Sequence, residues 1–168
     1  SLSLCLYSLL QRTSHVGFWY SYLCLGETIY TFGYGMELAC KTVTQTHFWL
    51  TFEMVGGAYL PGLVILMAYT YRYHTKAPLW LTTILLIVSS VTLVIQFGNE
   101  SHGLIFRSVE LAQHEGMSIS LLEFGPWFYV HMVYANIAMT VSTCLFYQCW
   151  KVMRKGDYLQ IYIINMGI

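Results

Sequence analysis

Apolar residues form long segments in this chain, and the clearest of them is Leu79–Phe97, which carries no charged residue. As a helix rising 1.5 Å per residue it would be about 28 Å long, close to the hydrocarbon thickness of a bilayer. Pro78 suits a first helical turn and Gly98 suits a helix end. Because similar segments surround it, we interpret this one as a membrane-spanning helix, not as a buried helix of a soluble protein.

The remaining apolar segments predict an all-α, polytopic transmembrane helix bundle that forms a single domain over 1–168. Gly56, Gly57 and Pro61 lie inside one of these segments, where they favour close helix packing and a kink, or a hinge used in signalling. The segments at both ends are too short to cross a bilayer, so we expect a fragment of a longer protein. Besides 79–97, the expected spans are 1–10 (partial), 17–40, 47–71, 125–150 and 158–168 (partial).

Basic residues are distributed unequally between the two sets of alternating loops. Six of the eight lie in 11–15, 72–77 and 151–157, and the other two lie in 41–46 and 99–124. The positive-inside rule therefore predicts that the first set is cytoplasmic and that the 99–124 loop is extracytoplasmic, in a multi-pass protein of the cytoplasmic (inner) membrane. The six residues are Arg12, Arg72, Lys76, Lys151, Arg154 and Lys155.

Composition supports the membrane interpretation and excludes several classes of function. Hydrophobic residues make up 57% of the chain and charged residues 10%, against about 25% charged in soluble domains. The net charge of zero gives no reason to expect a nucleic-acid partner. Phosphate loops and nucleophile motifs are absent from the sequence, so we expect no catalytic residues. The five cysteines have no metal-ligand spacing and indicate neither a disulfide framework nor a zinc site.

Three carboxyl side chains fall inside or near the expected spans: Glu27, Glu37 and Glu53. A charge in a span is costly and usually faces a bundle interior or a cavity. No Lys or Arg within the spans is available to pair with them, so each is expected to be protonated or hydrogen-bonded. Their role is either functional or a packing hydrogen bond between helices.

Histidines near the expected outer helix ends raise the question of a metal site. His47, His102 and His131 could bind a divalent metal with neighbouring carboxylates, but their spacing is nonlocal. Polar lining of a cavity is the favoured interpretation. A haem would need facing histidines at mid-membrane depth, which the sequence lacks. We therefore predict no metal and no cofactor.

Four stretches resemble the N-terminal seven-transmembrane sensor region of bacterial histidine kinases, which also precedes some diguanylate cyclases. The stretches are Tyr34-Gly-Met-Glu37-Leu; Phe48-Trp49 with Gly56 and Pro61; Phe97-Gly-Asn-Glu-Ser-His-Gly-Leu104; and Gly125-Pro-Trp-Phe128 with His131 and Tyr134. Together they cover about 34–134 in the family's order, although Gly98 stands where the family often has Thr. The resemblance implies a seven-helix sensor fold, a sensory input role and a cytoplasmic kinase or cyclase output, with a homodimer as the full-length form.

Residue chemistry and the resemblance indicate the same place for a ligand, at the outer ends of four expected helices. An apolar, aromatic-lined site with a few converging polar groups is typical of small-molecule binding. The lipid bilayer and an unidentified small-molecule or lipid ligand are the expected partners, and the predicted lining of the ligand site is Tyr34, Glu37, Asn99, His102, Trp127, His131 and Tyr134.

Two other classes of function remain open. Glu27, Glu37 and Glu53 could line the proton or cation path of a transporter or channel subunit, but the sequence shows no internal repeat and predicts no broken helices. A membrane enzyme could use the outer His and Glu side chains with a metal. We favour the sensor, which would bind its signal in one arrangement of the helices better than in another.

Overall fold

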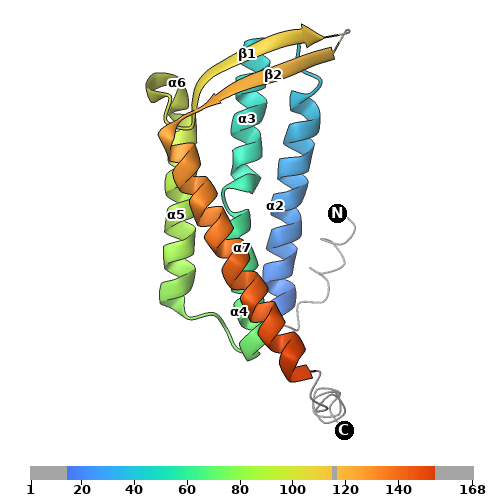
Figure 1. Cartoon of the computed structure of the whole chain (residues 1–168), viewed down its shortest axis with the longest axis vertical. Coiled ribbons are helices and arrows are strands. Elements are labelled where there is room, and N and C mark those ends of the chain that lie inside the picture. Colours follow the sequence, from blue (N-terminus) through green and yellow to red (C-terminus); the bar gives the residue numbers. More distant parts are fainter. Residues whose placement is uncertain (1–14, 115–116, 154–168) are drawn as a thin grey trace.

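The computed structural model describes residues 15–114 and 117–153. Five long helices, one short helix and a two-stranded antiparallel hairpin make up this part of the chain (Figure 1). The elements are α2 (His15–Glu37), α3 (Val43–Gly57), α4 (Leu60–Tyr73), α5 (Leu79–Phe97), α6 (Asn99–His102), β1 (Phe106–His114), β2 (Met117–Phe124) and α7 (Pro126–Met153). The expected partial spans 1–10 and 158–168 lie outside the described residues.

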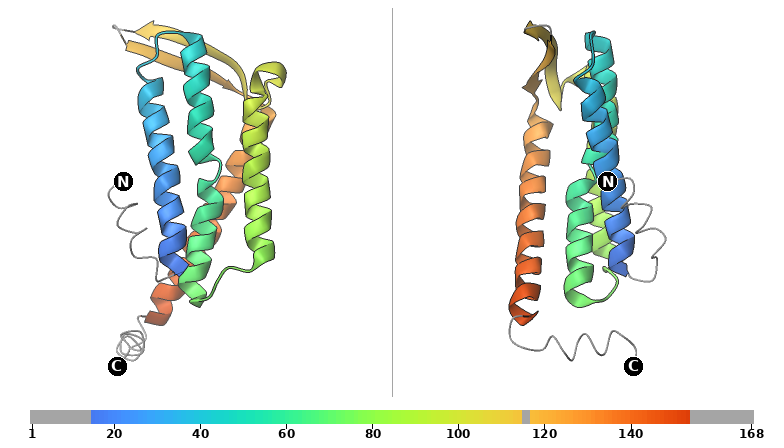
Figure 2. Two further views of the ribbon diagram at one scale, coloured as in Figure 1. Left: turned by 180° about the vertical axis from the view of Figure 1, so that it is seen from behind. Right: turned by 90° about the vertical axis from the view of Figure 1, so that its right-hand side faces the viewer.

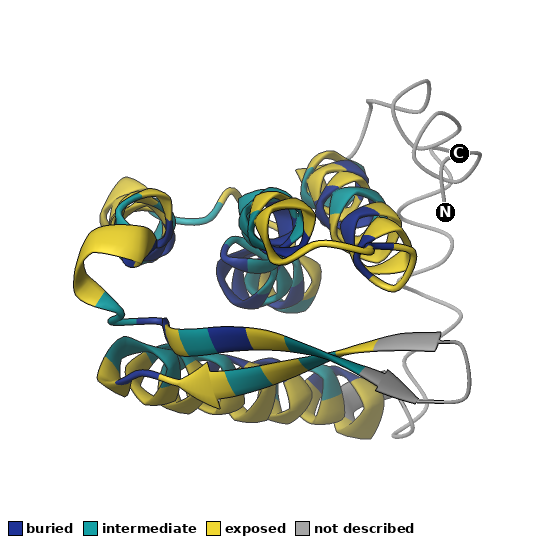
Figure 3. Ribbon diagram, turned by 90° about the horizontal axis from the view of Figure 1, so that it is seen from above, coloured by how far each residue is buried: buried dark blue, intermediate teal, exposed yellow. Residues whose placement is uncertain are grey.

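The long helices form two layers. Seen from above, α5, α3 with α4 beneath it, and α2 stand in a row, and α7 lies against one side of that row (Figure 3). Figure 2 shows that α7 reaches from the hairpin to the opposite end of the molecule. Ile65 and Leu66 of α4 pack with Leu85 of α5 and Ala138 of α7, which fixes the two layers together in the lower half.

The expected span 79–97 is confirmed as α5 with the same bounds. Its inward face is the polar one, because Ser89, Thr92 and Gln96 are buried. The outward face is apolar, with Val94 70% exposed. Soluble proteins do not expose apolar surface on this scale, so α5 is arranged for contact with lipid. Trp80, Ile84, Ile87 and Phe97 belong to the same exposed surface.

Three described segments are long and apolar enough to cross a membrane: Val43–Tyr73, Leu79–Phe97 and Pro126–Lys151. They correspond to the expected spans 47–71, 79–97 and 125–150. The helix α2, expected over 17–40, is not among them; it starts at His15 and ends at Glu37. The helix α2 lies beside α3 and α4 along its length (Figure 1). That it also crosses the membrane stays a prediction.

The expected helix 47–71 is interrupted, forming α3 and α4 with Ala58 and Tyr59 between them. Pro61 has no amide hydrogen to donate to the Gly57 carbonyl four residues earlier. The Tyr59 amide instead donates to the Gly56 carbonyl, a tighter turn than an α-helix makes. The predicted kink is therefore present, and the prediction that the chain lacks a broken helix is wrong.

The all-α prediction is wrong in the 99–124 loop, which contains α6 and the hairpin. Alternating apolar and polar residues in both strands favour extended pairing, with Val109 opposite Leu122. Ile105, Phe106 and Val109 are buried against Leu50 of α3, so the hairpin lies across the end of the bundle (Figure 1). Two strands of eight or nine residues gain this supporting surface from the helices.

The two ends of the bundle carry different charges. The hairpin, α6 and the connection from α2 to α3 lie at one end, and the connection from α4 to α5 lies at the other (Figure 1). Arg72, Lys76 and Lys151 belong to that second end, and Lys41 and Arg107 to the hairpin end. Arg12, Arg154 and Lys155 of the predicted cytoplasmic set lie outside the described residues.

Candidate functional site

Asn99 holds the base of the hairpin. Its Oδ1 accepts hydrogen bonds from the backbone amides of Ile105 (2.8 Å) and Phe106 (3.1 Å), and its Nδ2 donates to the Phe106 carbonyl at 2.9 Å. The side chain is buried. One amide therefore satisfies three backbone groups where the chain turns from α6 into β1.

The exposed side chain of His102 lies beside this turn, where its Nδ1 accepts a hydrogen bond from the Leu104 amide at 3.1 Å. The turn needs Gly103, whose φ of 59° lies in the left-handed region. His102 is thus placed at the rim of the hairpin end, in contact with the position of Gly98.

The hairpin passes into α7 without a flexible linker. The Gly125 amide donates to the Ile105 carbonyl at 2.7 Å, and the Trp127 amide donates to the Leu104 carbonyl at 2.9 Å. A β-carbon at position 125 would collide with the Gly103 and Leu104 carbonyl oxygens, so only glycine fits there. This junction ties the first turn of α7 to the base of β1.

Thr92 joins α5 to α7 through its hydroxyl group. Trp127 Nε1 donates to Thr92 Oγ1 at 3.2 Å, and His131 Nδ1 lies 3.4 Å from the same oxygen. The hydroxyl itself donates to the Val88 carbonyl at 3.1 Å. Trp127 and His131, four residues apart on α7, therefore share one partner on the neighbouring helix.

One turn further along α7, the hydroxyl of Tyr134 faces α4 and α5. It lies 3.0 Å from the place where a β-carbon on Gly62 would stand. The Ser89 hydroxyl of α5 lies near it. Neither hydroxyl has a partner in good hydrogen-bond geometry.

Glu37 and Glu53 form a second, separate polar contact, between α2 and α3. Both side chains are buried, and the Glu53 carboxyl has the Glu37 carboxyl as its side-chain hydrogen-bond partner. A hydrogen bond between two carboxyl groups requires at least one proton on the pair. The other Glu53 oxygen, Oε1, has no partner, and Gly33 leaves the room that the Glu53 side chain occupies.

The seven predicted ligand residues thus fall into three groups. Asn99 and His102 organise the hairpin base, and Trp127, His131 and Tyr134 follow one face of α7. Glu37 contacts Glu53 across the α2–α3 interface, while Tyr34 is exposed on α2. Four cavities in the described part of the chain are each lined by at most one of the seven residues. Their binding of a ligand stays a prediction.

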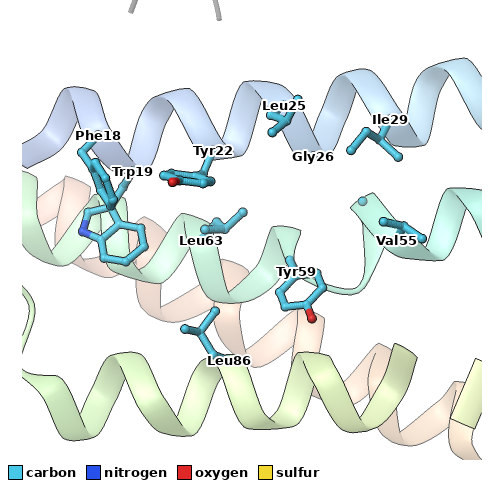
Figure 4. Close-up of a pocket in the computed structure, with 11 residues that line it drawn as sticks. Phe18, Trp19, Tyr22, Leu25, Gly26, Ile29, Val55, Tyr59, Leu63 and Leu86 are labelled. Carbon is cyan, nitrogen blue, oxygen red and sulfur yellow. The ribbon is translucent and has the colours of Figure 1, made fainter. Parts of the chain in front are cut away.

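Two cavities lie on opposite sides of the α3–α4 interruption. The first, about 420 Å³, is almost wholly apolar and lies between α2, the interruption and α5, with α7 behind them (Figure 4). The second, about 440 Å³, lies between α2, the interruption and α7. Gly57 and Pro61 contribute to its wall, and Glu27 and His131 are the two side chains in it that carry an ionisable charge.

Several residues that build these contacts were not expected from the sequence. Ser89, Thr92 and Gln96 follow one another at helical spacing along α5, and all three are buried. Polar residues at that spacing in an apolar segment would have indicated the inward face of the helix. Gly26 and Gly33 of α2, which accept α3 closely, repeat at a spacing of two turns.

The histidines are not gathered into a metal site. Within residues 15–114 and 117–153 there is no group of three or more His, Cys, Asp or Glu side chains placed to hold a metal ion. Cys24, Cys40, Cys144 and Cys149 are free thiols, and Cys5 lies outside the described residues.

Comparison with protein families matches residues 1–168 to the N-terminal 7TM region of histidine kinase. No curated protein and no solved structure gives a significant match to the chain. The match covers every stretch on which the resemblance was based, including the ends of α2 and α5 and the entry to α7. The family region is the membrane input part of a kinase, as distinct from its catalytic part. The chain therefore belongs to the family of N-terminal 7TM regions of histidine kinases, and it is a multi-pass membrane protein of that family.

Proposed function

We propose that this chain is the sensory input region of a cytoplasmic-membrane histidine kinase. It detects a signal from outside the cell, or one dissolved in the membrane, and passes it to a kinase domain in the cytoplasm. In this arrangement the 99–124 segment is extracytoplasmic and the full-length protein is a homodimer. A diguanylate cyclase is the alternative output, because both classes carry such input regions.

The observation that carries this proposal is the continuous connection from the hairpin to the far end of α7. Gly125 and the Trp127 backbone fix the first turn of α7 to the hairpin base. The helix then runs unbroken for 28 residues to Met153. A displacement of the hairpin therefore has a stiff path to the opposite end, because an α-helix transmits movement without a flexible joint.

A signal acts on such a path only if it favours one of two arrangements. The ligand must bind one arrangement better than the other, and the difference in binding free energy sets the shift in population. The Thr92 contacts between α5 and α7 are short-range hydrogen bonds that two helix positions would satisfy differently. They are the contacts we expect to change first.

An insertion series in the intact kinase tests the relay through α7. One alanine inserted after Lys151 rotates everything downstream by about 100°, whereas seven inserted residues nearly restore the helix face. We expect the single insertion to change the autophosphorylation rate in lipid nanodiscs at least several-fold and the seven-residue insertion to retain it. Equal rates in the parent protein and in both insertion variants would contradict the proposal.

Transport is a second candidate, and the interrupted helix favours it. Transporters place substrate and ion sites at broken helices near mid-membrane, and α3 and α4 meet between two cavities. Flux of protons or monovalent cations into liposomes containing the purified protein separates the two functions. We expect no flux above that of protein-free liposomes; flux that Glu27→Gln abolishes would establish the transporter instead.

A further inference from the structure

The cavity between α2 and α7 combines a mostly apolar wall, to which Tyr30 adds a hydroxyl group, with one carboxyl and one imidazole side chain from two different helices. Glu27 approaches it from α2 and His131 from α7. Most of the remaining wall is apolar, and it includes the flexible thioether side chains of Met54, Met132 and Met139. A volume of about 440 Å³ is within the usual range for small-molecule sites. The chemistry of Glu27 and His131 then decides what kind of molecule fits.

The hydrogen bonds of Thr92 define the role of His131. Thr92 Oγ1 donates its own hydrogen to the Val88 carbonyl at 3.1 Å and accepts one from Trp127 Nε1. Its remaining capacity is a lone pair, so His131 Nδ1, at 3.4 Å, has to be the donor in that contact. A neutral imidazole with its proton on Nδ1 has a lone pair on Nε2. His131 therefore offers the cavity a hydrogen-bond acceptor.

Glu27 lines the same cavity with an exposed side chain, and its carboxyl group can ionise beside a bound cation. In the described part of the chain, no Lys or Arg lines this cavity. The basic residues there lie at the helix ends and in the connections: Lys41, Arg72, Lys76, Arg107 and Lys151. A carboxylate attracts a positive charge more strongly beside apolar surface than in bulk water. Glu27 and His131 therefore both suit a partner that donates hydrogen bonds.

We propose that this cavity binds a hydrophobic amine in its protonated form. The ammonium group would lie between the Glu27 carboxylate and His131 Nε2, and the apolar body would contact the methionine and aromatic walls. Tyr30 and Phe128 belong to that wall and add attraction for a cation through their ring faces. The proposal builds on the sensory function, since it names the chemical class of the signal.

Methionine methyl groups report binding at this cavity directly. The sequence has eight methionines, and three of them, Met54, Met132 and Met139, line the cavity. With ¹³C-methyl methionine in the chain reconstituted in nanodiscs, 1-adamantylamine is titrated and the methyl resonances are followed by NMR. We expect saturable shifts of these three resonances, with Met36 and Met67 unchanged because they lie outside the cavity wall.

Charge and shape are separated with a matched ligand and a matched variant. 1-Adamantanol has nearly the same shape without the charge, and we expect it to bind at least tenfold more weakly. Glu27→Gln keeps the size of the side chain and is expected to weaken amine binding at least tenfold while leaving the alcohol unaffected. Glu123→Gln, an exposed carboxyl on β2 away from the cavity, serves as the control and should change neither affinity.

Each alternative result has a definite meaning. Equal binding of amine and alcohol, insensitive to Glu27→Gln, would show that the cavity takes an uncharged apolar molecule such as a lipid chain, and the proposal would be overturned. Absence of methyl shifts would overturn it as well. Binding is measured without a kinase domain, so its failure leaves the proposed function untouched. Binding that does not alter autophosphorylation of the intact kinase would overturn the sensory role of the cavity.

Discussion

Asn99 illustrates how a residue expected to bind a ligand is committed to the backbone. Its amide group satisfies two backbone N–H groups and one carbonyl at the entry to β1. The site is buried, so water cannot replace these bonds. The same residue can influence a ligand only through the position of the hairpin that it holds.

Replacing Asn99 with alanine should loosen the hairpin. Three buried backbone groups would lose their partners, at about 1 kcal/mol each, so we expect a loss of about 2–4 kcal/mol in unfolding free energy. Asn136→Ala is the control, since Asn136 is exposed and bonds only to the Met132 carbonyl of its own helix. Denaturant unfolding in detergent gives the energies, and amide exchange at Ile105 and Phe106 locates them. Equal losses in both variants would refute the assignment.

Thr92 is expected to contribute more to the stability of the bundle than a small side chain usually does. Thr92→Val leaves Trp127 Nε1 and His131 Nδ1 without a partner, which should cost about 1–3 kcal/mol. Thr92→Ser keeps the oxygen and should restore most of the stability. Thr83→Val, on the exposed side of the same helix, controls for the general effect of replacing a threonine hydroxyl group with a methyl group. In ¹⁵N spectra, His131 should carry its proton on Nδ1 in the parent chain; a proton on Nε2 would contradict the network.

Glycines set the distance between α2 and α3. A β-carbon on Gly56 would overlap the Gly26 carbonyl oxygen and stand 3.0 Å from the Tyr30 amide nitrogen. Both contacts are with backbone, which cannot rotate away. The close approach brings Glu37 and Glu53 together further along the same interface. Small residues at helix contacts are the common means of association between helices in membranes.

Alanine at Gly56 should therefore separate α2 from α3. We expect a destabilisation of about 1–3 kcal/mol from overpacking. Gly35→Ala on α2 is the matched substitution, because nothing lies within 4 Å of the new β-carbon, and the better helix propensity of alanine should stabilise it by up to about 1 kcal/mol. Thermal unfolding of the two variants in nanodiscs decides; a neutral Gly56→Ala would contradict the close contact.

The sequence predicted the helices better than the connections between them. Uninterrupted apolar character gave the bounds of α5, and Gly56, Gly57 and Pro61 predicted the kink, although not that it divides the helix. The hairpin in the 99–124 loop was not predicted, although its strands alternate apolar and polar residues. Short strands of this kind depend on tertiary contacts, here with Leu50, which a local pattern does not contain.

The candidate site was predictable only in part. Trp127 and His131 were both predicted to belong to the site, and they share Thr92 as a partner. Neither Thr92 nor the meeting of Glu37 with Glu53 could be read from spacing, because both contacts join separate helices whose packing depends on glycines. The cavity around Glu27 likewise could not be predicted, because residues from α2, α3, α4 and α7 line it and only the assembled molecule brings these helices together.

Two long helices, α5 and α7, bury polar side chains and expose large apolar ones. Ser142 of α7 is buried while Ile137 is 58% exposed, and α5 shows the same inversion. Lipid replaces water as the surrounding solvent over these surfaces. The positive-inside rule predicts that the more basic end of the bundle lies in the cytoplasm.

Sidedness can be measured with single cysteines in a background that lacks the five native ones. Ser101→Cys lies on α6 at the hairpin end, and Lys76→Cys lies in the connection from α4 to α5; both positions are exposed. A membrane-impermeant maleimide should label Ser101→Cys in intact cells and label Lys76→Cys only after permeabilisation. The reverse pattern would invert the assigned topology.

The interruption at Ala58 and Tyr59 divides one span into two helices that pack against different parts of the molecule. The upper rod, α3, is fastened to α2 and the hairpin, and the lower rod, α4, to α7. With 14 residues, α4 is roughly 21 Å long. Tilting it by about 5° at Tyr59 would move its far end, at Tyr73, by about 2 Å, comparable to the helix shifts that operate known switches. A bend too small to disturb the packing of α3 or of α4 would thus produce a larger displacement at the end of α4, which a downstream domain could detect.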